Sequence, residues 1–179
     1  YHDQLFWIWR HKRFDVVEQV YALGKAGMTI DGAIIRQARQ DEADQIATVA
    51  RISLEHFLPY LPKLHSLEDD KAFYRNHVFA ECDVWVAEKE QEIIGVCAFQ
   101  EGWVNHLYLL PQHVGRTYGA SLLNKAKERH AYLQLWVFQR NERAQSFYRR
   151  HGFQKVKKTD GQTNDEKTAD ALYEWRKPQ

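Results

Sequence analysis

A strand, a glycine-containing loop and a helix follow one another over residues 105–127, and this unit limits the possible folds more than any other stretch. Leu107–Leu110 is an apolar run of strand length. Pro111 ends it, because proline has no N–H to donate to a neighbouring strand. Gly115 and Gly119 stand in the loop that follows. Apolar residues then recur at helical spacing, namely Leu122, Leu123 and Ala126.

This loop predicts an anion site. The first turn of a helix presents backbone N–H groups that have no partner in the helix, at the positive end of its dipole. Glycines let the backbone approach a phosphate or pyrophosphate without a Cβ in the way. The spacing of Gly115 and Gly119 matches neither the P-loop nor the Gly-x-Gly-x-x-Gly dinucleotide pattern. An ordinary strand-to-helix turn with two glycines is the alternative.

Composition excludes several classes of function. The 179 residues are enough for one globular domain, and 44% of them are hydrophobic. Because 25 Lys and Arg nearly balance 24 Asp and Glu, no nucleic-acid partner and no anionic membrane surface are expected. Cys82 and Cys97 lack the spacing of a metal site, so we expect structural thiols in a reducing compartment and no metal. With no membrane-length apolar run and no recognisable signal peptide, a cytoplasmic location is predicted.

The chain divides into an N-terminal extension, residues 1–30, and a domain over residues 31–179. The extension contains the aromatic stretch Phe6–Trp9, followed by apolar residues at helical spacing. One interpretation is an added helix that packs on the domain or on a second copy, giving a homodimer. The other is upstream sequence before a natural start at Met28, the single methionine.

The apolar patterns predict the element order β-α-α-β-β-β-α-β-α-β-β. Ser66 followed by Asp69 predicts the capped start of the second helix. The expected strands lie near residues 33–37, 84–87, 93–99, 107–110, 132–138, 153–156 and 171–175.

A second motif is more specific. The stretch Asn141-Glu-Arg-Ala144-Gln-Ser-Phe147-Tyr148-Arg-Arg-His-Gly152-Phe153 resembles the pattern Asn-x-x-Ala-x-x-Phe-Tyr-x-x-x-Gly-Phe of the GNAT superfamily of N-acetyltransferases. The element order and the glycine loop also resemble that family. Residues 159–173 are similar to small bacterial members. The resemblance covers roughly residues 33–176.

The resemblance implies an α/β (α+β) fold, with a mixed, mostly antiparallel sheet of six to seven strands flanked by about four helices. It implies transfer of acetyl from acetyl-coenzyme A to an amine. The implied cofactor contacts are Leu107, Tyr108, Leu109, Gly115, Arg116, Thr117, Tyr118, Gly119, Ala120, Asn141 and Tyr148. The loop departs from the family pattern, because Val114 replaces Arg or Gln and Thr117 replaces the first glycine. We therefore expect weakened cofactor affinity.

The resemblance also assigns chemical roles. The Leu109 N–H would polarise the acetyl carbonyl, Asn141 would bind the pantetheine arm, and Tyr148 would protonate the leaving thiolate. A phenol suits this role because its pKa of about 10 is near that of a thiol. The alternatives are a core aromatic for Tyr148 and a helix N-cap for Asn141.

The general base is less clearly marked. His106 has a suitable pKa, but strand alternation places it with Val104 and Tyr108, away from Leu107, unless a bulge intervenes. Glu101, at the start of the strand, is the other candidate. A base acting through water is a third hypothesis.

Four further residues are predicted to bind the acceptor: Tyr60, His65, Asn105 and Glu166. The acidic turn that contains Glu166 would favour a cationic amine, whereas a solvated hairpin tip is the alternative. The predicted function is N-acetyl transfer to a primary amine of a small molecule, with a peptide amine as the other substrate. A non-catalytic acyl-coenzyme A binder is the alternative.

Overall fold

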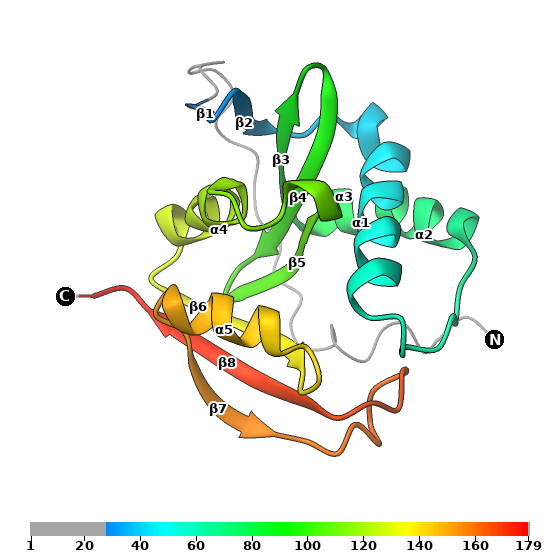
Figure 1. Ribbon diagram of the computed structural model, residues 1–179, viewed down its shortest axis with the longest axis vertical. Helices are drawn as coiled ribbons and strands as arrows, with labels where there is room; N and C mark the ends of the chain where they lie inside the picture. Colours follow the sequence, from blue (N-terminus) through cyan, green and yellow to red (C-terminus); the bar gives the residue numbers. More distant parts are fainter. Residues whose placement is uncertain (1–27, 179) are drawn as a thin grey trace.

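The computed structural model describes residues 28–178, which form one eight-stranded sheet with helices on both faces (Figure 1). The order across the sheet is β1-β2-β3-β4-β5-β6-β8-β7. The strands are β1 (Met28–Ile30), β2 (Ala33–Gln37), β3 (Asp83–Lys89), β4 (Glu92–Gln100), β5 (Trp103–Leu109), β6 (Tyr132–Phe138), β7 (Gln154–Lys158) and β8 (Asp170–Arg176).

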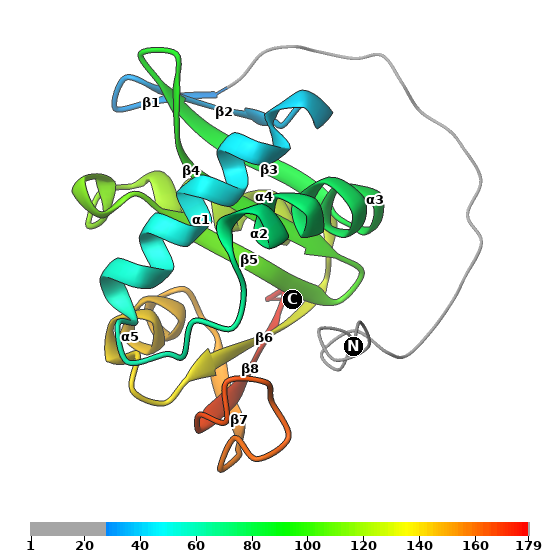
Figure 2. The ribbon, with the colours of Figure 1, turned by 90° about the vertical axis from the view of Figure 1, so that its right-hand side faces the viewer.

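Four helical stretches flank the sheet. The first is α1 (Ala43–Phe57), and the second runs from α2 (Leu67–Phe73) through a π-turn (Tyr74–Val78) into α3 (Phe79–Glu81). The third and fourth are α4 (Tyr118–Arg129) and α5 (Glu142–Arg150). In Figure 2, α1 and α2 lie on the near face of the sheet and α4 lies behind it. None of the helices described within residues 28–178 is long and apolar enough to cross a membrane.

The sheet has two antiparallel halves that meet at one short parallel contact. Strands β1–β5 pair antiparallel in sequence order, and β6, β8 and β7 form the second antiparallel group. Between β5 and β6 the ladder contains a single pair, Trp103 with Gln134. Beyond that pair the two strands separate, so the C-terminal half of β5 has no strand partner on its β6 side (Figure 1).

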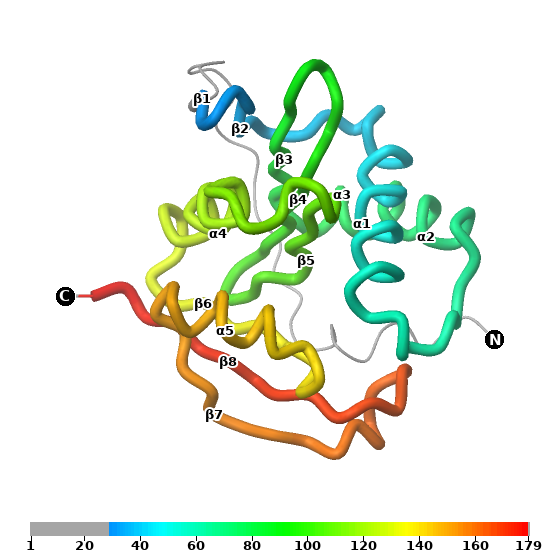
Figure 3. Tube along the Cα trace, viewed as in Figure 1, coloured from blue at the N-terminus to red at the C-terminus, as the bar shows by residue number. Residues whose placement is uncertain are grey.

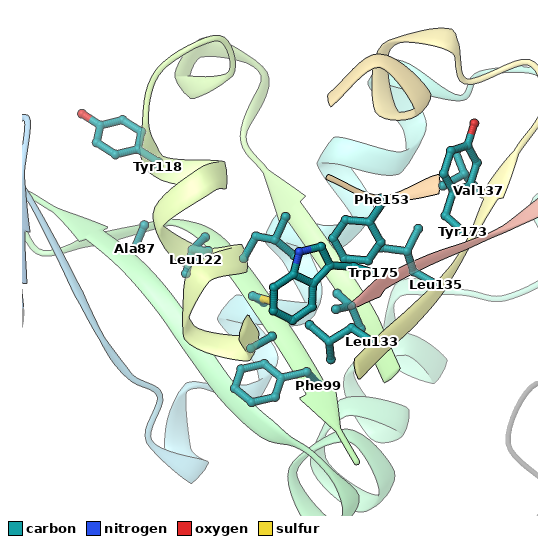
Figure 4. Close-up of a cluster of buried hydrophobic side chains, with 14 of the residues drawn as sticks. Ala87, Phe99, Tyr118, Leu122, Leu133, Leu135, Val137, Phe153, Tyr173 and Trp175 are labelled. Atoms are coloured by element: carbon teal, nitrogen blue, oxygen red, sulfur yellow. The ribbon is translucent and has the colours of Figure 1, made fainter. Parts of the chain in front are cut away.

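One apolar core joins the two halves. Its buried members include Phe99 from β4, Leu122 from α4, Leu133 from β6 and Trp175 from β8 (Figure 4). A second core lies under α1 and α2, on the other face of the sheet. Burial of such side chains, worth about 25 cal/mol per Å² of apolar surface, holds the halves together where hydrogen bonds between strands are lacking.

The predicted fold class is confirmed, and the strand count is higher than the six to seven expected. The extra strand is β1, which pairs with β2 through Asp31 and Gly32, both at positive φ (53° and 79°). An Asp-Gly pair is a strong hairpin signal that the sequence analysis did not use. The sheet thus begins at Met28, before the boundary expected at residue 31, and the helix predicted within residues 1–27 lies outside the described residues.

Local signals identify most of the other elements. The expected strand over residues 132–138 matches β6. Ser66 caps α2, since its side-chain oxygen accepts from the Asp69 N–H (3.1 Å). Both cysteines are free thiols, as expected.

Candidate active site

A cavity of about 650 Å³ lies where β5 and β6 separate, and we call it the main cavity. Its wall comes from the last turns of α1, the end of β5, the loop before α4, and α5. Ten of the eleven predicted cofactor contacts line it: Leu107, Tyr108, Leu109, Gly115, Arg116, Thr117, Gly119, Ala120, Asn141 and Tyr148. The structure therefore brings together the two motifs that are most specific in the sequence.

The end of β5 offers free backbone groups to this cavity. The Leu110 N–H donates to the Ile94 oxygen of β4 (2.9 Å). In an antiparallel pair, alternate residues direct their N–H and C=O groups toward and away from the partner strand. Leu107 and Leu109 therefore point these groups away from β4, into the gap left by β6.

The loop before α4 has the geometry of an anion site. Gly115 has a φ of +86°, which favours glycine, whereas Thr117 has a helical φ of −75°, so its side chain causes no strain. The first backbone hydrogen bond reported at this end joins the Ser121 N–H to the Thr117 oxygen (3.0 Å). The preceding N–H groups of the first turn, including that of Gly119, are thus left for a ligand. A Cβ on Gly119 would lie 3.2 Å from Leu109 Cδ1, so glycine lets the helix approach the strand closely.

Tyr118 differs from the other ten predicted cofactor contacts. Its side chain is fully buried and does not line the main cavity. Instead the Tyr118 hydroxyl donates to the Asp31 oxygen (3.0 Å), which ties α4 to the β1–β2 turn. The Tyr118 ring packs in the apolar core because it lies on the inner face of the first turn of α4.

Helix α5 supplies the remaining predicted groups. Asn141 is the N-cap, and its Oδ1 accepts from the Ala144 N–H (3.1 Å). Tyr148 lines the cavity and packs against Phe147 and Phe153, with ring centroids 5.2 and 5.5 Å away. Burial, with smaller contributions from nearby Cys97 and Tyr108, raises the pKa of Tyr148 well above its usual 10, so the phenol is protonated at neutral pH.

Positive charge also surrounds the main cavity. Arg143 and Arg150 line it together with Arg116. The Arg143 guanidinium stacks over Phe57 of α1 at 5.0 Å, so α1 and α5 meet at the cavity wall. Arg143, Arg150 and Phe57 were not predicted from the sequence, since residues of α1 and α5 are remote in sequence and no pattern indicates that they meet.

Comparisons with known proteins agree with this arrangement. Residues 80–155 match the family model described as an acetyltransferase (GNAT) domain. By this match, residues 80–155 form a GNAT domain.

Individual relatives extend the likeness over most of the chain. The chain is 28% identical over 121 residues to the peptidyl-lysine N-acetyltransferase YiaC of Escherichia coli. The alignment covers 67% of this chain and 82% of that protein. A GCN5-related N-acetyltransferase structure from Rhodopseudomonas palustris matches with a TM-score of 0.69 at 17% identity, covering 84% and 99% of the two chains. The PaiA N-acetyltransferase of Thermoplasma acidophilum, solved with coenzyme A, matches with a TM-score of 0.62 at 21% identity, covering 81% and 99%.

His106 lies outside the main cavity of this GNAT domain. A bulge makes Asn105 an extra residue of β5, between the pairs Ala98–His106 and Phe99–Val104. Val104 consequently packs in the α4 core, whereas His106 lies on the α1 and α2 face beside Tyr74 (ring centroids 5.2 Å apart). The expected alternation, which grouped Val104 with His106, is therefore wrong across the bulge.

The surroundings of His106 disfavour a charged imidazole. Its Nδ1 lies 3.4 Å from the Tyr74 hydroxyl, and its buried Nε2 has no hydrogen-bond partner among the described residues. Burial lowers the pKa of His106 to about 4, so the ring is neutral at physiological pH. It borders neither of the two cavities described here.

Two other predicted residues also lie away from the main cavity. Glu101 is exposed in the β4–β5 turn, six residues before Leu107 and hence about 20 Å away along the strand. The Asn105 Oδ1 lies 3.9 Å from the Cys82 sulfur, at the bulge. Neither residue lines the cavity.

A second cavity of about 350 Å³ adjoins the first, and we call it the acceptor pocket. Leu54 and Leu58 border both cavities. His65 and Glu166, predicted to bind the acceptor, line the pocket together, although 100 residues separate them. Tyr60 does not line it; its ring packs under the Arg140 guanidinium (3.9 Å).

Proposed function

We propose that this GNAT domain transfers acetyl from acetyl-coenzyme A to a primary amine of a small molecule. The observation that carries the proposal is the main cavity, into which the free edge of β5, the first turn of α4 and Tyr148 converge. In this proposal the end of β5 binds the acetyl group, the loop before α4 binds the pyrophosphate, and the acceptor pocket binds the amine.

The residues of the main cavity fit coenzyme A. The free N–H groups before Ser121 and the nearby Arg116 suit a pyrophosphate, which carries negative charge on oxygens that accept hydrogen bonds. The apolar side chains of Leu54, Phe57 and Phe147 suit the pantetheine arm. When bound, acetyl-coenzyme A supplies an activated acyl group on a thiol that leaves readily.

The protein's own groups would then act in order. The Leu109 N–H would donate to the acetyl oxygen and stabilise the negative charge that develops there. The Tyr148 hydroxyl would give a proton to the departing sulfur. Burial keeps this phenol protonated before the transfer, although it also raises the phenol's pKa above that of a thiol. Holding the amine and the thioester in adjacent cavities would supply the gain from proximity.

The acceptor is proposed as a small molecule because the sequence has no extended acidic or basic tract for docking a peptide. The named activity of the Escherichia coli relative makes a peptide lysine the main competing substrate. A non-catalytic binder of acyl-coenzyme A is the second candidate, supported by the position of His106 outside both cavities.

Release of coenzyme A thiol in the presence of a panel of amines tests these candidates. The panel would contain small primary amines and lysine-containing peptides, each at several concentrations. Turnover with a small amine supports the proposal, and turnover with peptides alone would replace its substrate. Tight binding of acetyl-coenzyme A without any turnover would support the non-catalytic binder.

A further inference from the structure

The acceptor pocket has apolar walls and a carboxylate at one side. Four leucines, Leu54, Leu58, Leu61 and Leu64, contribute to its surface. Its volume of about 350 Å³ can hold a short aliphatic chain. The pocket forms where the loop between α1 and α2 approaches the loop between β7 and β8 (Figure 3), and Glu166 is the residue that the second loop contributes.

The other acidic groups of the pocket already have cationic partners. Arg51 Nε donates to Asp70 Oδ2 (2.6 Å), and Lys63 Nζ lies 3.2 Å from Glu55 Oε1. Among the described residues, the Glu166 carboxylate has no ion pair and no hydrogen bond to another side chain; the Thr168 hydroxyl donates to the Glu166 backbone oxygen (2.9 Å). It is the pocket carboxylate that remains for a cationic ligand.

Charged and titratable groups from both faces of the pocket surround Glu166. Burial raises the pKa of Glu166 above its usual range, Asp165 and Asp170 raise it further, and its own backbone N–H and His65 lower it. Burial raises the pKa of Tyr108 of β5 to about 12, with smaller contributions from the charges of Glu166 and Asp70. The groups facing the pocket are Arg51, Glu55, Lys63, His65, Asp70 and Glu166.

The β7–β8 loop holds Glu166 in a fixed position. Asn164, which is buried, donates from Nδ2 to the Thr168 oxygen (2.7 Å) and to Asp170 Oδ2 (3.0 Å). A Cβ on Gly161 would approach the Thr168 backbone to 2.2 Å, so the loop closes tightly on itself. Side chains that act on a substrate need such support, because small displacements cost rate.

We propose that Glu166 is the catalytic residue that binds the acceptor's ammonium group and removes its proton. The inference rests on the proposed acetyl transfer and supplies the base that His106 and Glu101 do not provide. It also defines the substrate class: a primary amine at the end of an aliphatic stem, with no carboxylate next to the amine.

The step balances in protons and bonds. The ammonium gives one proton to the Glu166 carboxylate, and the neutral nitrogen forms a C–N bond to the acetyl carbon. The C–S bond breaks, and the sulfur takes the Tyr148 proton. The nitrogen, positively charged once the C–N bond has formed, loses a second proton that restores the Tyr148 hydroxyl. Glu166 passes the first proton to solvent, so each turnover releases a single proton.

The test compares Glu166→Gln with Asp165→Asn, which makes the same change of charge one residue away without lining the pocket. For the first variant we expect kcat/KM with an aliphatic primary amine to fall about 100-fold, as when a general base is lost. The wild type should lose activity as falling pH protonates Glu166, and the variant should lack this acid limb. Asp165→Asn should keep the rate at neutral pH and should keep an acid limb, moved to lower pH because Asp165 raises the pKa of Glu166.

Two further measurements exclude a structural effect. The melting temperature and the affinity for acetyl-coenzyme A should be the same in Glu166→Gln and the wild type. If that variant does not fold, Glu166→Asp keeps the carboxylate but shortens it; we expect about a 10-fold loss with a shifted acid limb.

Each outcome has a distinct meaning. Glu166→Gln within three-fold of wild-type activity, or Glu166→Asp with the wild-type rate and pH profile, would overturn the role of Glu166 while leaving acetyl transfer intact. Wild-type turnover that favours α-amino acids over simple aliphatic amines would overturn the substrate class. No wild-type turnover with any amine would contradict the proposed function, and this inference with it.

Discussion

Tyr108 and Tyr148 both line the main cavity, and burial raises the pKa of each phenol. Their surroundings nevertheless differ. Tyr108 packs toward α1 and α2 beside His106, whereas Tyr148 packs with the aromatic residues of α5 and the α4 core. Tyr148 therefore lies on the same side of the sheet as α4, whose first turn is proposed to hold the pyrophosphate.

Replacing Tyr148 by Phe tests its proposed role as an acid. The change removes one hydroxyl and keeps the ring that packs against Phe147 and Phe153. We expect kcat to fall about 100-fold, the magnitude typical of losing a general acid, with little change in the affinity for acetyl-coenzyme A. Steady-state kinetics and calorimetric titration measure the two quantities. Unchanged kcat would assign the hydroxyl no part in the proton transfer.

The sequence could predict the position of those residues that belong to local motifs. The loop glycines, Asn141 and Tyr148 line the main cavity because each belongs to a short pattern that carries its own geometry. His106 could not be placed this way, since the extra residue at Asn105 reverses the alternation of β5. A bulge depends on the partner strand, and no single-strand pattern contains that information.

At the scale of secondary-structure elements, the loop between β5 and α4 is the one that borders the main cavity. The conformation of this loop depends on Gly115. A Cβ on Gly115 would meet no atom within 4 Å, so glycine is required there for its φ of +86° and not for space. Gly102, in the β4–β5 turn, has a similar φ of +76° and equally open surroundings. The two positions differ in function, because only Gly115 borders the main cavity.

Gly115→Ala and Gly102→Ala therefore form a matched pair. Each should lower the free energy of unfolding by about 1 kcal/mol, the cost of holding a non-glycine residue in the left-handed region. Gly115→Ala should also weaken acetyl-coenzyme A binding several-fold, because the loop then rearranges, whereas Gly102→Ala should not. Denaturant unfolding and calorimetric titration distinguish the effects. Equal affinities in both variants would argue against a phosphate-binding role for the loop.

The sequence predicts individual helices and strands better than it predicts the contacts between them. Strand β6 and the Ser66 cap were predicted from local patterns. Two cation–π contacts were not predicted: Arg143 of α5 over Phe57 of α1, and Arg140, before α5, over Tyr60, after α1. These contacts form only after the sheet has brought the two helices together, so no local pattern predicts them.

At the scale of the molecule, residues 28–178 form two half-sheets joined by one parallel pair and a shared apolar core. The main cavity is bounded by β5 and the α4 loop from the first half and by α5 from the second. A ligand that fills this cavity contacts both halves. It should therefore stabilise the molecule as a unit and also reduce local opening between the halves.

Thermal melting with and without acetyl-coenzyme A tests this expectation. A ligand present at 100 times its Kd adds about 2.7 kcal/mol to the stability of the native state. For a chain of this size that corresponds to a rise in Tm of roughly 5–10 °C. Because Val114 lacks the long side chain usual in the family, the half-saturating concentration should be high, and millimolar ligand is the appropriate upper limit.

Hydrogen exchange then shows which segments of the protein acetyl-coenzyme A contacts. Acetyl-coenzyme A should slow exchange in the α4 loop, at Leu107 and Leu109, and in the first turn of α5. Adenosine diphosphate carries the pyrophosphate without the pantetheine arm, so it should protect the loop alone. Equal protection by both ligands would mean that the gap between β5 and β6 is not the pantetheine site. No protection and no rise in Tm at millimolar acetyl-coenzyme A would contradict cofactor binding in the main cavity.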